Sequence, residues 1–479
     1  MRPFPEVSPM KLTPPLVSRL LLACALASAA VVACTSTSST GPKPPGDTQV
    51  AQQAIPPACD PNPTCPGSTC ATSITAALSS PPVDACSRHG EFQSDVDVYS
   101  WNTFIAMNWP ADTSTCLPDT KASILSGQGP VVWETYPQDS DIFVAPGAGP
   151  PGKWCTFATP AAVEKQLLRL RAATPAERRM VAGGRVDKVL VSDSKASDVV
   201  AERFGGIGQA VGGPLTDQNG RFVRYEKRVN LDEYNYLIAN NLWNAAGQKG
   251  VTVSFPTGPN QNPGPCNGGP CGPVGAMELK ASWKVLSPAE ISGKRFYMRK
   301  AWVFNDEAGD ASPGANPVTV GLVGLHIIHK TQTQTTWFWS TFEHVDNTTA
   351  SFFNPHCPNC QDNTQTAKQP YTELAPDGGP LNAPVQVVRT TPIQADSLSP
   401  GLNDYYRGLL KGSVWANYQL ISTQWATGGA PQGTPTPLAN VTMETFIQPQ
   451  ASCLGCHKSA TTADGSASAD FSFLLGEAQ

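Results

Sequence analysis

The chain has 479 residues, of which 38 are acidic and 33 are lysine or arginine, so its net charge is −5 at pH 7. This mildly acidic balance argues against nucleic acid as a partner and is compatible with a partner of basic surface. Proline and glycine number 46 and 41 and are spread throughout, which predicts many turns and short elements.

The first 33 residues predict a lipoprotein signal peptide. Positive charges precede an apolar run over residues 20–33, which has signal-peptide length and is too short to span a bilayer. The run ends in Val-Val-Ala-Cys at Cys34, which resembles the lipobox of bacterial lipoproteins, with Cys24 as a weaker competitor. We therefore expect lipidation at Cys34 and membrane association through this N-terminal lipid anchor, on the periplasmic side of the bacterial envelope. By the same resemblance, Thr35 in place of an aspartate favours the outer membrane.

Composition divides the remainder of the chain into three parts. Residues 34–57 are rich in Ser, Thr and Pro, which predicts a flexible tether from the lipid. Residues 58–425 are expected to form a β-rich, disulfide-containing body, because no second linker of similar bias interrupts them. Residues 426–479 are expected to form a short C-terminal segment that carries the motif at 453–457.

Cysteine usage predicts an oxidising compartment. Fourteen cysteines are present, and two in the leader and two in the motif leave ten, which predicts five disulfides of unspecified connectivity. Cys266–Cys271 and Cys357–Cys360 are expected local pairs, because Gly, Pro and Asn lie between the partners. His356 precedes Cys357 and raises zinc as an alternative, but a disulfide is favoured in that compartment.

Strand signals dominate the second half of the body. Residues 277–285 alternate apolar and polar side chains, which is the pattern of a half-buried strand. Four more strands are expected over 295–304, 318–330, 337–344 and 414–425, with a hairpin loop at 331–336. Helices are expected over 161–171, 232–243 and 402–410. The predicted fold class is therefore β-rich α+β, a large antiparallel-sheet body with a few helices and a short C-terminal segment that contains residues 453–457.

The strongest functional signal is the sequence Cys-Leu-Gly-Cys-His at 453–457, the c-type haem attachment pattern. In this chemistry the thiols of Cys453 and Cys456 add across the two haem vinyl groups, and the imidazole of His457 binds the iron. One covalent haem c is therefore the expected cofactor. The alternative is a disulfide or zinc pair that happens to precede a histidine, which the export signal makes less favourable.

A sixth ligand of the iron must come from upstream, since 22 residues follow His457 and none is Met or His. His344 is the leading candidate, because it follows Glu343 at a strand end, where acidic neighbours could raise its basicity or hold its tautomer. His326 and His329 are alternatives, but they are three apart on a predicted strand and so face opposite sides. Two upstream methionines are expected to be core residues rather than ligands: Met107 and Met443.

Several segments resemble a group of bacterial proteins described as cytochrome c family proteins. They are 101–110 (WNTFIAMNWP), 324–330 (GLHIIHK), 337–347 and 452–475. The resemblance spans most of the mature chain and implies one haem and electron transfer, but no firm activity. The chain departs from small cytochromes c, whose motif lies near the start, and from the four-helix-bundle type, because its body is rich in strands.

Two functions from different classes follow. The first is an electron carrier with a six-coordinate haem. The alternative is a haem-dependent, peroxidase-like oxidoreductase whose open distal iron site faces the β-rich body. The size of the body favours the oxidoreductase, whereas the lack of a recognisable acid–base pair favours the carrier. A scaffold with a structural haem is a third possibility. Whether the chain is an enzyme, and which redox partner or substrate it meets, is left open.

Overall fold

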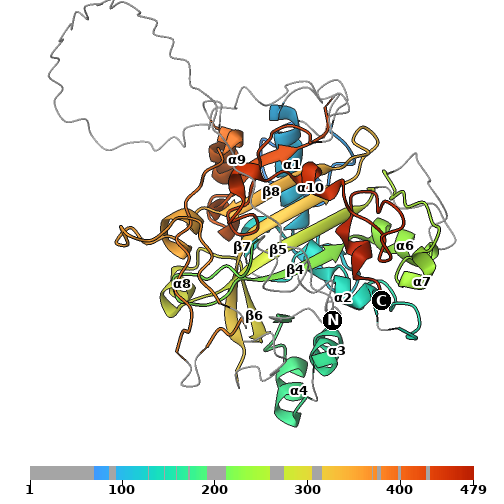
Figure 1. The fold of residues 1–479 in the computed structure, drawn as a ribbon, viewed down its shortest axis with the longest axis horizontal. Coiled ribbons are helices and arrows are strands. Elements are labelled where there is room, and N and C mark those ends of the chain that lie inside the picture. The colour runs from blue at the N-terminus through green and yellow to red at the C-terminus, as the bar shows by residue number, and fades with distance from the viewer. Residues whose placement is uncertain are drawn as a thin grey trace, which may run out of the picture. The chain divides into compact units, whose positions relative to one another are not determined.

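A seven-stranded, mostly antiparallel sheet forms the centre of the structure (Figure 1). Only the outermost pair, β3 and β6, is parallel. The strands are β3 (Lys188–Leu190), β4 (Arg224–Val229), β5 (Met277–Val285), β6 (Met298–Val303), β7 (Val318–His329), β8 (Phe338–His344) and β9 (Tyr418–Gln424). A separate two-stranded sheet joins β1 (Ala111–Asp112) to β2 (Leu117–Pro118).

This computed structural model describes residues 69–85, 93–127, 129–144, 146–157, 159–170, 173–190, 212–258, 274–304, 316–368, 371–374, 379–396, 401–427 and 432–479. The predicted signal peptide, the lipidation site Cys34, the tether and the pair Cys266–Cys271 lie outside these ranges. Within them, no helix has the length and apolar character that are needed to cross a membrane.

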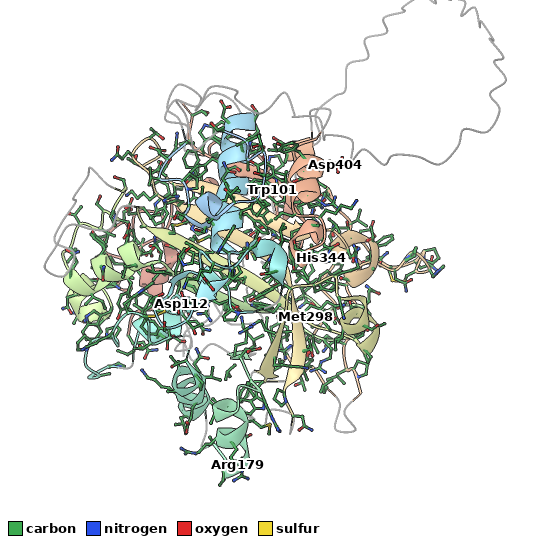
Figure 2. The ribbon with its side chains drawn as sticks, turned by 180° about the vertical axis from the view of Figure 1, so that it is seen from behind. Trp101, Asp112, Arg179, Met298, His344 and Asp404 are labelled. Carbon is green, nitrogen blue, oxygen red and sulfur yellow. A yellow bond between two sulfur atoms is a disulfide. The ribbon has the colours of Figure 1, made fainter. Side chains whose placement is uncertain are left out.

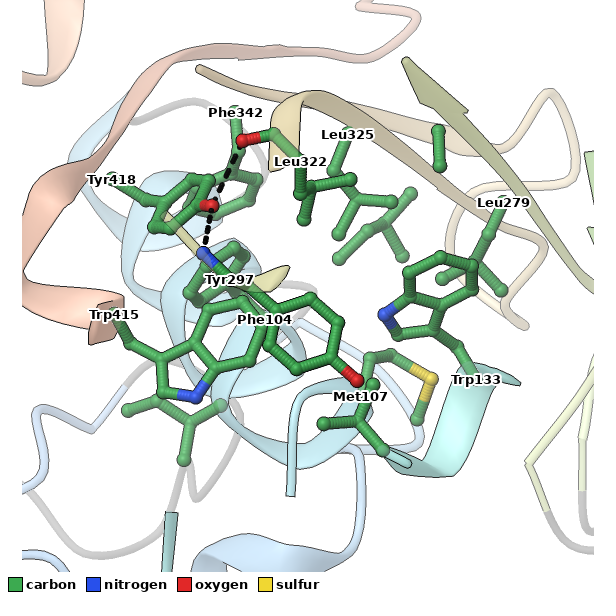
Figure 3. Close-up of a cluster of buried hydrophobic side chains, with 14 of the residues drawn as sticks. Phe104, Met107, Trp133, Leu279, Tyr297, Leu322, Leu325, Phe342, Trp415 and Tyr418 are labelled. Carbon is green, nitrogen blue, oxygen red and sulfur yellow. Dashed lines mark hydrogen bonds between the residues drawn. The ribbon is translucent and has the colours of Figure 1, made fainter. Parts of the chain in front are cut away.

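The long strand β7 divides the sheet. One of its edges pairs with β5, while the other pairs first with β6 and then with β8. The hydroxyl of Tyr418 lies at this division, where it accepts a hydrogen bond from the backbone N of Tyr297 (3.0 Å) and donates one to the O of Leu322 (2.9 Å) (Figure 3). The side chain thereby satisfies backbone groups at the point where the strand pairing changes.

Helix α1 (Gln93–Met107) covers one face of the sheet, here called the α1 face. Every residue from Asp95 to Met107 is buried. Trp101 stacks on Tyr406 with ring centroids 5.1 Å apart, and Phe104 stacks on Phe342 at 4.3 Å. The strands contribute apolar side chains to this face: Leu279, Ala281, Trp283, Leu325, Ile327 and Leu420.

Residues 432–479 cover the opposite face, here called the C-terminal face. Figure 1 shows α1 in blue behind the strands and the red C-terminal segment in front of them. Asn440 donates a hydrogen bond to Oγ1 of Thr341 (3.0 Å), and the hydroxyls of Ser282 and Thr442 lie 2.7 Å apart. Both faces of the central strands are therefore covered by protein.

The other helices are short and lie around the sheet. They are α2 (Asp139–Ile142), α3 (Pro160–Leu170), α4 (Pro175–Ala182), α6 (Leu231–Ala239), α7 (Ala245–Gln248), α8 (Pro288–Gly293), α9 (Leu402–Leu409) and α10 (Cys453–His457), with several 3-10 turns between them. Two disulfides connect described cysteines, Cys116–Cys155 and the expected pair Cys357–Cys360.

The predicted α+β class with a mostly antiparallel sheet is confirmed, although 29% helix exceeds 20% strand, so the helices are more than a few. The strand expected at 277–285 has the predicted bounds, and the hairpin between β7 and β8 forms. The strand expected at 414–425 begins later, because Val414–Asn417 forms a 3-10 turn. Met443 lies in a run of turns.

Candidate functional site

The five motif residues form the short helix α10. Cys453 and Cys456 are three positions apart and His457 is four positions from Cys453, so the two thiols and the imidazole share one face of this turn. Neither thiol has a disulfide partner. Ser452 caps the helix, because its Oγ accepts a hydrogen bond from the N of Gly455 (3.0 Å).

The last residue of β9 attaches this turn to the sheet. The side chain of Gln424 is buried, accepts a hydrogen bond from the N of Leu454 (2.9 Å) and donates one to Oγ of Ser452 (3.2 Å). Leu454 is 1% exposed and packs into a core cluster beneath the turn. Gly433 has φ +63°, and a Cβ there would lie 2.4 Å from Cδ1 of Leu454, so this close approach requires glycine.

The imidazole of His457 is held between two aromatic rings. Its ring centroid lies 4.4 Å from that of Trp339 on β8 and 4.8 Å from that of Phe473. Nδ1 lies 2.8 Å from the backbone O of Phe471, so Nδ1–H donates to this carbonyl. Burial lowers the pKa of His457 to about 4, which keeps the ring neutral. The hydrogen bond leaves the lone pair on Nε2, the nitrogen that can bind a metal.

The loop that supplies this carbonyl is itself anchored. Nε1 of Trp337 donates to the O of Asp470 (3.0 Å), and the N of Phe255 donates to Oδ2 of Asp470 (2.7 Å). Lys330 forms an ion pair with the same carboxylate. The backbone of Asp470 and Phe471 has positive φ, 53° and 72°. Contacts from three other segments thus fix the carbonyl that orients His457.

Ionisable side chains gather on the C-terminal face beside this motif. Lys280 on β5 and His326 on β7 are directly paired across the two strands. Nε2 of His326 lies 3.6 Å from Oε2 of Glu444 in the covering segment. Charge interactions link all three residues to His457, and Glu444 also acts on Cys453. The sheet therefore brings residues that are far apart in sequence to one place.

The environment shifts several pKa values in this group. Burial lowers the pKa of Lys280 to about 8. Burial opposes ionisation of Glu444, yet His326 and Lys280 together lower the pKa of this carboxyl. Burial raises the pKa of the Cys453 thiol, and Glu444 adds to the effect.

His344 is not brought to the motif. It lies at the end of β8 (Figure 2), five residues from Trp339, which corresponds to about 17 Å along a strand and to opposite faces of the sheet. Its Nε2 bonds the O of Arg295 and its Nδ1 accepts from the N of Asp346, both at 3.2 Å. Burial lowers the pKa of His344 to about 4 and outweighs the neighbouring Asp346, which acts to raise it as the acidic surroundings predict. This placement gives His344 no access to an iron on His457.

The remaining candidate ligands lie elsewhere. His329 faces the α1 face, where its ring contacts the hydroxyl of Tyr99, so His326 and His329 point to opposite sides as the alternation predicts. Met107 and Met443 both lie in apolar core clusters. Cys357 forms the disulfide with Cys360, so neither offers a thiolate for zinc. In the described part of the chain, no three His, Cys, Asp or Glu side chains are grouped to hold a metal ion.

The comparisons with known proteins give no family for this chain: no family model, curated protein or solved structure matches it. The resemblance to cytochrome c family proteins therefore rests on its sequence segments alone. The spacing of the motif predicts Cys453, Cys456 and His457 as site residues, and the structure places all three on α10. The Phe471 carbonyl and the pair His326–Glu444 have no local sequence signal, because only the tertiary fold brings them to the motif.

Proposed function

We propose that the chain is an exported monohaem c-type cytochrome that carries electrons through one covalently attached haem. The observation that carries this proposal is the arrangement on α10, where two unpaired thiols and one imidazole share a helix face. The imidazole donates through Nδ1 to the Phe471 carbonyl, which leaves Nε2 available for iron. Two thiols and one axial nitrogen are the donor set that haem c needs.

Each residue of the site then has a defined task. Cys453 and Cys456 would hold the porphyrin through thioethers, and His457 would bind the iron through Nε2. The Phe471 carbonyl fixes the tautomer of His457, while Trp339 and Phe473 limit rotation of its ring. The haem supplies the one-electron chemistry when bound. The protein holds the axial ligand rigidly, so that the iron environment changes little between oxidation states.

The predicted location is part of the same proposal. The disulfides Cys116–Cys155 and Cys357–Cys360 support an oxidising compartment, which is where c-type haem is attached. Lipidation at Cys34 would anchor the protein on the periplasmic side of the envelope, with the outer membrane favoured. A redox partner of basic surface would suit the net charge of −5.

The direct test is to produce the chain together with the c-type haem maturation system and to denature it before measuring its absorption spectrum. We expect haem to stay with the polypeptide, and to be lost from a Cys453→Ser/Cys456→Ser variant. The matched control is Cys357→Ser/Cys360→Ser, which removes another closely spaced cysteine pair and should retain the haem. Loss of haem from wild-type chain on denaturation would overturn the proposal.

A second candidate function is a haem-dependent oxidoreductase with an open distal site. It is favoured by the ionisable group Lys280, His326 and Glu444, because paired acidic and basic side chains beside an iron can move protons. Carbon monoxide separates the two functions. An electron carrier with two protein ligands should keep its ferrous spectrum when carbon monoxide is added, whereas an open site should bind it.

A further inference from the structure

One histidine on the C-terminal face has a ring nitrogen that is not hydrogen-bonded. Nε2 of His326 is buried and makes no hydrogen bond to any described residue. The nearest acidic atom, Oε2 of Glu444 at 3.6 Å, is beyond hydrogen-bond distance and already accepts from the N of Asn440 (2.8 Å). A buried polar atom without a partner is costly, by about 1–3 kcal/mol, and calls for a ligand or another explanation.

Apart from the expected proximal ligand His457, the other histidines in the described ranges do not offer a free, buried nitrogen in this way. His329 uses Nδ1 for the Tyr99 hydroxyl and Nε2 for the O of Val274 (2.7 Å). His344 uses both nitrogens for backbone groups. His356 is exposed and directly precedes the loop closed by Cys357–Cys360.

The register of the sheet places His326 next to the motif. On β8 its direct partner is Thr341, and Trp339 is two residues earlier on the same face. Diagonal neighbours of this kind have Cβ atoms about 7–8 Å apart. Because the ring of Trp339 contacts that of His457, the side chain of His326 projects from the sheet beside the ring of the expected axial ligand. Its side chain is 12% exposed, so little water reaches it.

We propose that His326 is the sixth ligand of the iron, bound through Nε2 on the side of the porphyrin opposite His457. This assignment rests on the proposed haem function. It gives a ligand to the Nε2 atom that makes no hydrogen bond, and it places the second ligand on a central strand, which is more rigid than a loop. Lys280 is the neighbour that competes for this role, since it lies directly beside His326 on β5. Two imidazole ligands give a low-spin, six-coordinate iron, which suits an electron carrier.

The experiment compares wild-type chain with His326→Ala and His326→Gln, each matured with haem, by absorption and electron paramagnetic resonance spectroscopy. We expect wild type to be low-spin in both oxidation states and unaffected by carbon monoxide. Both variants should keep covalent haem, become high-spin and bind carbon monoxide, and free imidazole should restore the low-spin spectrum. His356→Ala is the matched control, since it removes an exposed histidine and should leave every spectrum unchanged.

The outcomes separate the two proposals. Covalent haem that is high-spin in wild type, or low-spin and unchanged in both His326 variants, would overturn the assignment of His326 and leave the haem proposal intact. If the low-spin spectrum were lost in Lys280→Met but kept in His326→Gln, Lys280 would be the sixth ligand. That result would also overturn the assignment of His326. Wild-type chain without covalent haem would overturn the haem function itself. The wild-type spectrum keeps the test valid even if a variant fails to fold.

Discussion

The two faces of the sheet differ although both are covered by protein. On the α1 face, β5 contributes Leu279 and Ala281 to an apolar core. On the C-terminal face the same strand contributes Glu278 and Lys280, both largely removed from water. Strands covered on both faces usually have continuous apolar sequences, because burying ionisable groups is costly. Because β5 alternates apolar and ionisable residues although both of its faces are covered, its C-terminal face is more consistent with a functional role than with packing alone.

The carboxyl pair Glu233–Glu278 shows how strongly this face departs from a packed core. Both oxygens of Glu233 and Oε1 of Glu278 are buried without hydrogen bonds. Burial raises the pKa of both groups, that of Glu278 to about 7, and their mutual interaction reinforces the effect for Glu233. Asp470 raises both further, while Lys330 acts against the effect on Glu233 and Lys227 acts against it on Glu278. Burial therefore favours the protonated form of both carboxyls.

The largest expected effect comes from the α1 face. Leu279→Ala removes a side chain that is 1% exposed, and we expect it to lower the free energy of unfolding by about 2–5 kcal/mol. Urea unfolding followed by circular dichroism measures this change. The haem spectrum of the folded variant should match wild type, because the substitution lies on the opposite face. A changed axial-ligand spectrum would contradict the claim that the α1 face and the C-terminal face act independently.

Glu278→Gln tests the C-terminal face through pH. A folded-state pKa raised to about 7 means that the folded state binds the proton more tightly than the unfolded state. The contribution of protonated Glu278 to the stability of the folded state is thus fully present below the ordinary glutamate pKa. It is lost as pH rises through 7. We expect the variant to be more stable than wild type at pH 8 by on the order of 2–3 kcal/mol, and similar at pH 4.

The control for this prediction is Asp404→Asn on α9, because the Asp404 side chain is 81% exposed. It should show no such pH dependence when urea midpoints are compared at pH 4 and pH 8. A stability difference between Glu278→Gln and wild type that is the same at both pH values would contradict the account of this carboxyl pair.

Tyr418→Phe tests the division of the sheet. The substitution removes the hydroxyl that bonds Tyr297 and Leu322 and leaves these backbone groups without that partner (Figure 3). We expect a loss of about 1–2 kcal/mol in unfolding free energy, again from urea titration. Tyr405→Phe is a related control, because its hydroxyl donates a hydrogen bond to the O of Ala71 and takes no part in the division of the sheet. A loss no larger than that of the control would show that the hydroxyl is unimportant at the division.

For Lys280→Met we expect the smallest effect on stability, together with a measurable change in the midpoint potential of the haem. The substitution removes the cost of burying the ammonium but also removes its charge interaction with Glu444. Because these two effects oppose each other, we expect the unfolding free energy to change by within about 1 kcal/mol. At pH 7 the ammonium is mostly charged, because its pKa is about 8. A positive charge near the iron opposes the ferric state, so its removal should lower the midpoint potential. A spectroelectrochemical titration that gives an unchanged or higher potential would place Lys280 away from the haem.

Much of the sheet could be predicted, because alternation is a local signal. Residues 277–285 alternate without interruption, and β5 has the same bounds. Helix α1 gave no such signal, since every residue from Asp95 to Met107 is buried and no polar stripe marks a solvent face. The motif on α10 was also readable, because its spacing is contained in five residues.

The residues on the distal side of the site could not be predicted from local sequence patterns. His344 was favoured because it ends a strand, but its access depends on which face it shares with Trp339, and the two are an odd number of positions apart. His326 and Glu444 are 118 positions apart, and only the packing of residues 432–479 against β7 brings them together. Contacts of that kind follow from strand register and from the covering segment, and neither can be read from the residues themselves.

The most direct test of the central claim is the mass of the intact, unfolded wild-type chain after production with the c-type haem maturation system. The account predicts that the mature chain gains the mass of one haem, with both Cys453 and Cys456 blocked against thiol reagents. A chain without added mass, or one in which these cysteines stay reactive or pair with each other, would contradict it.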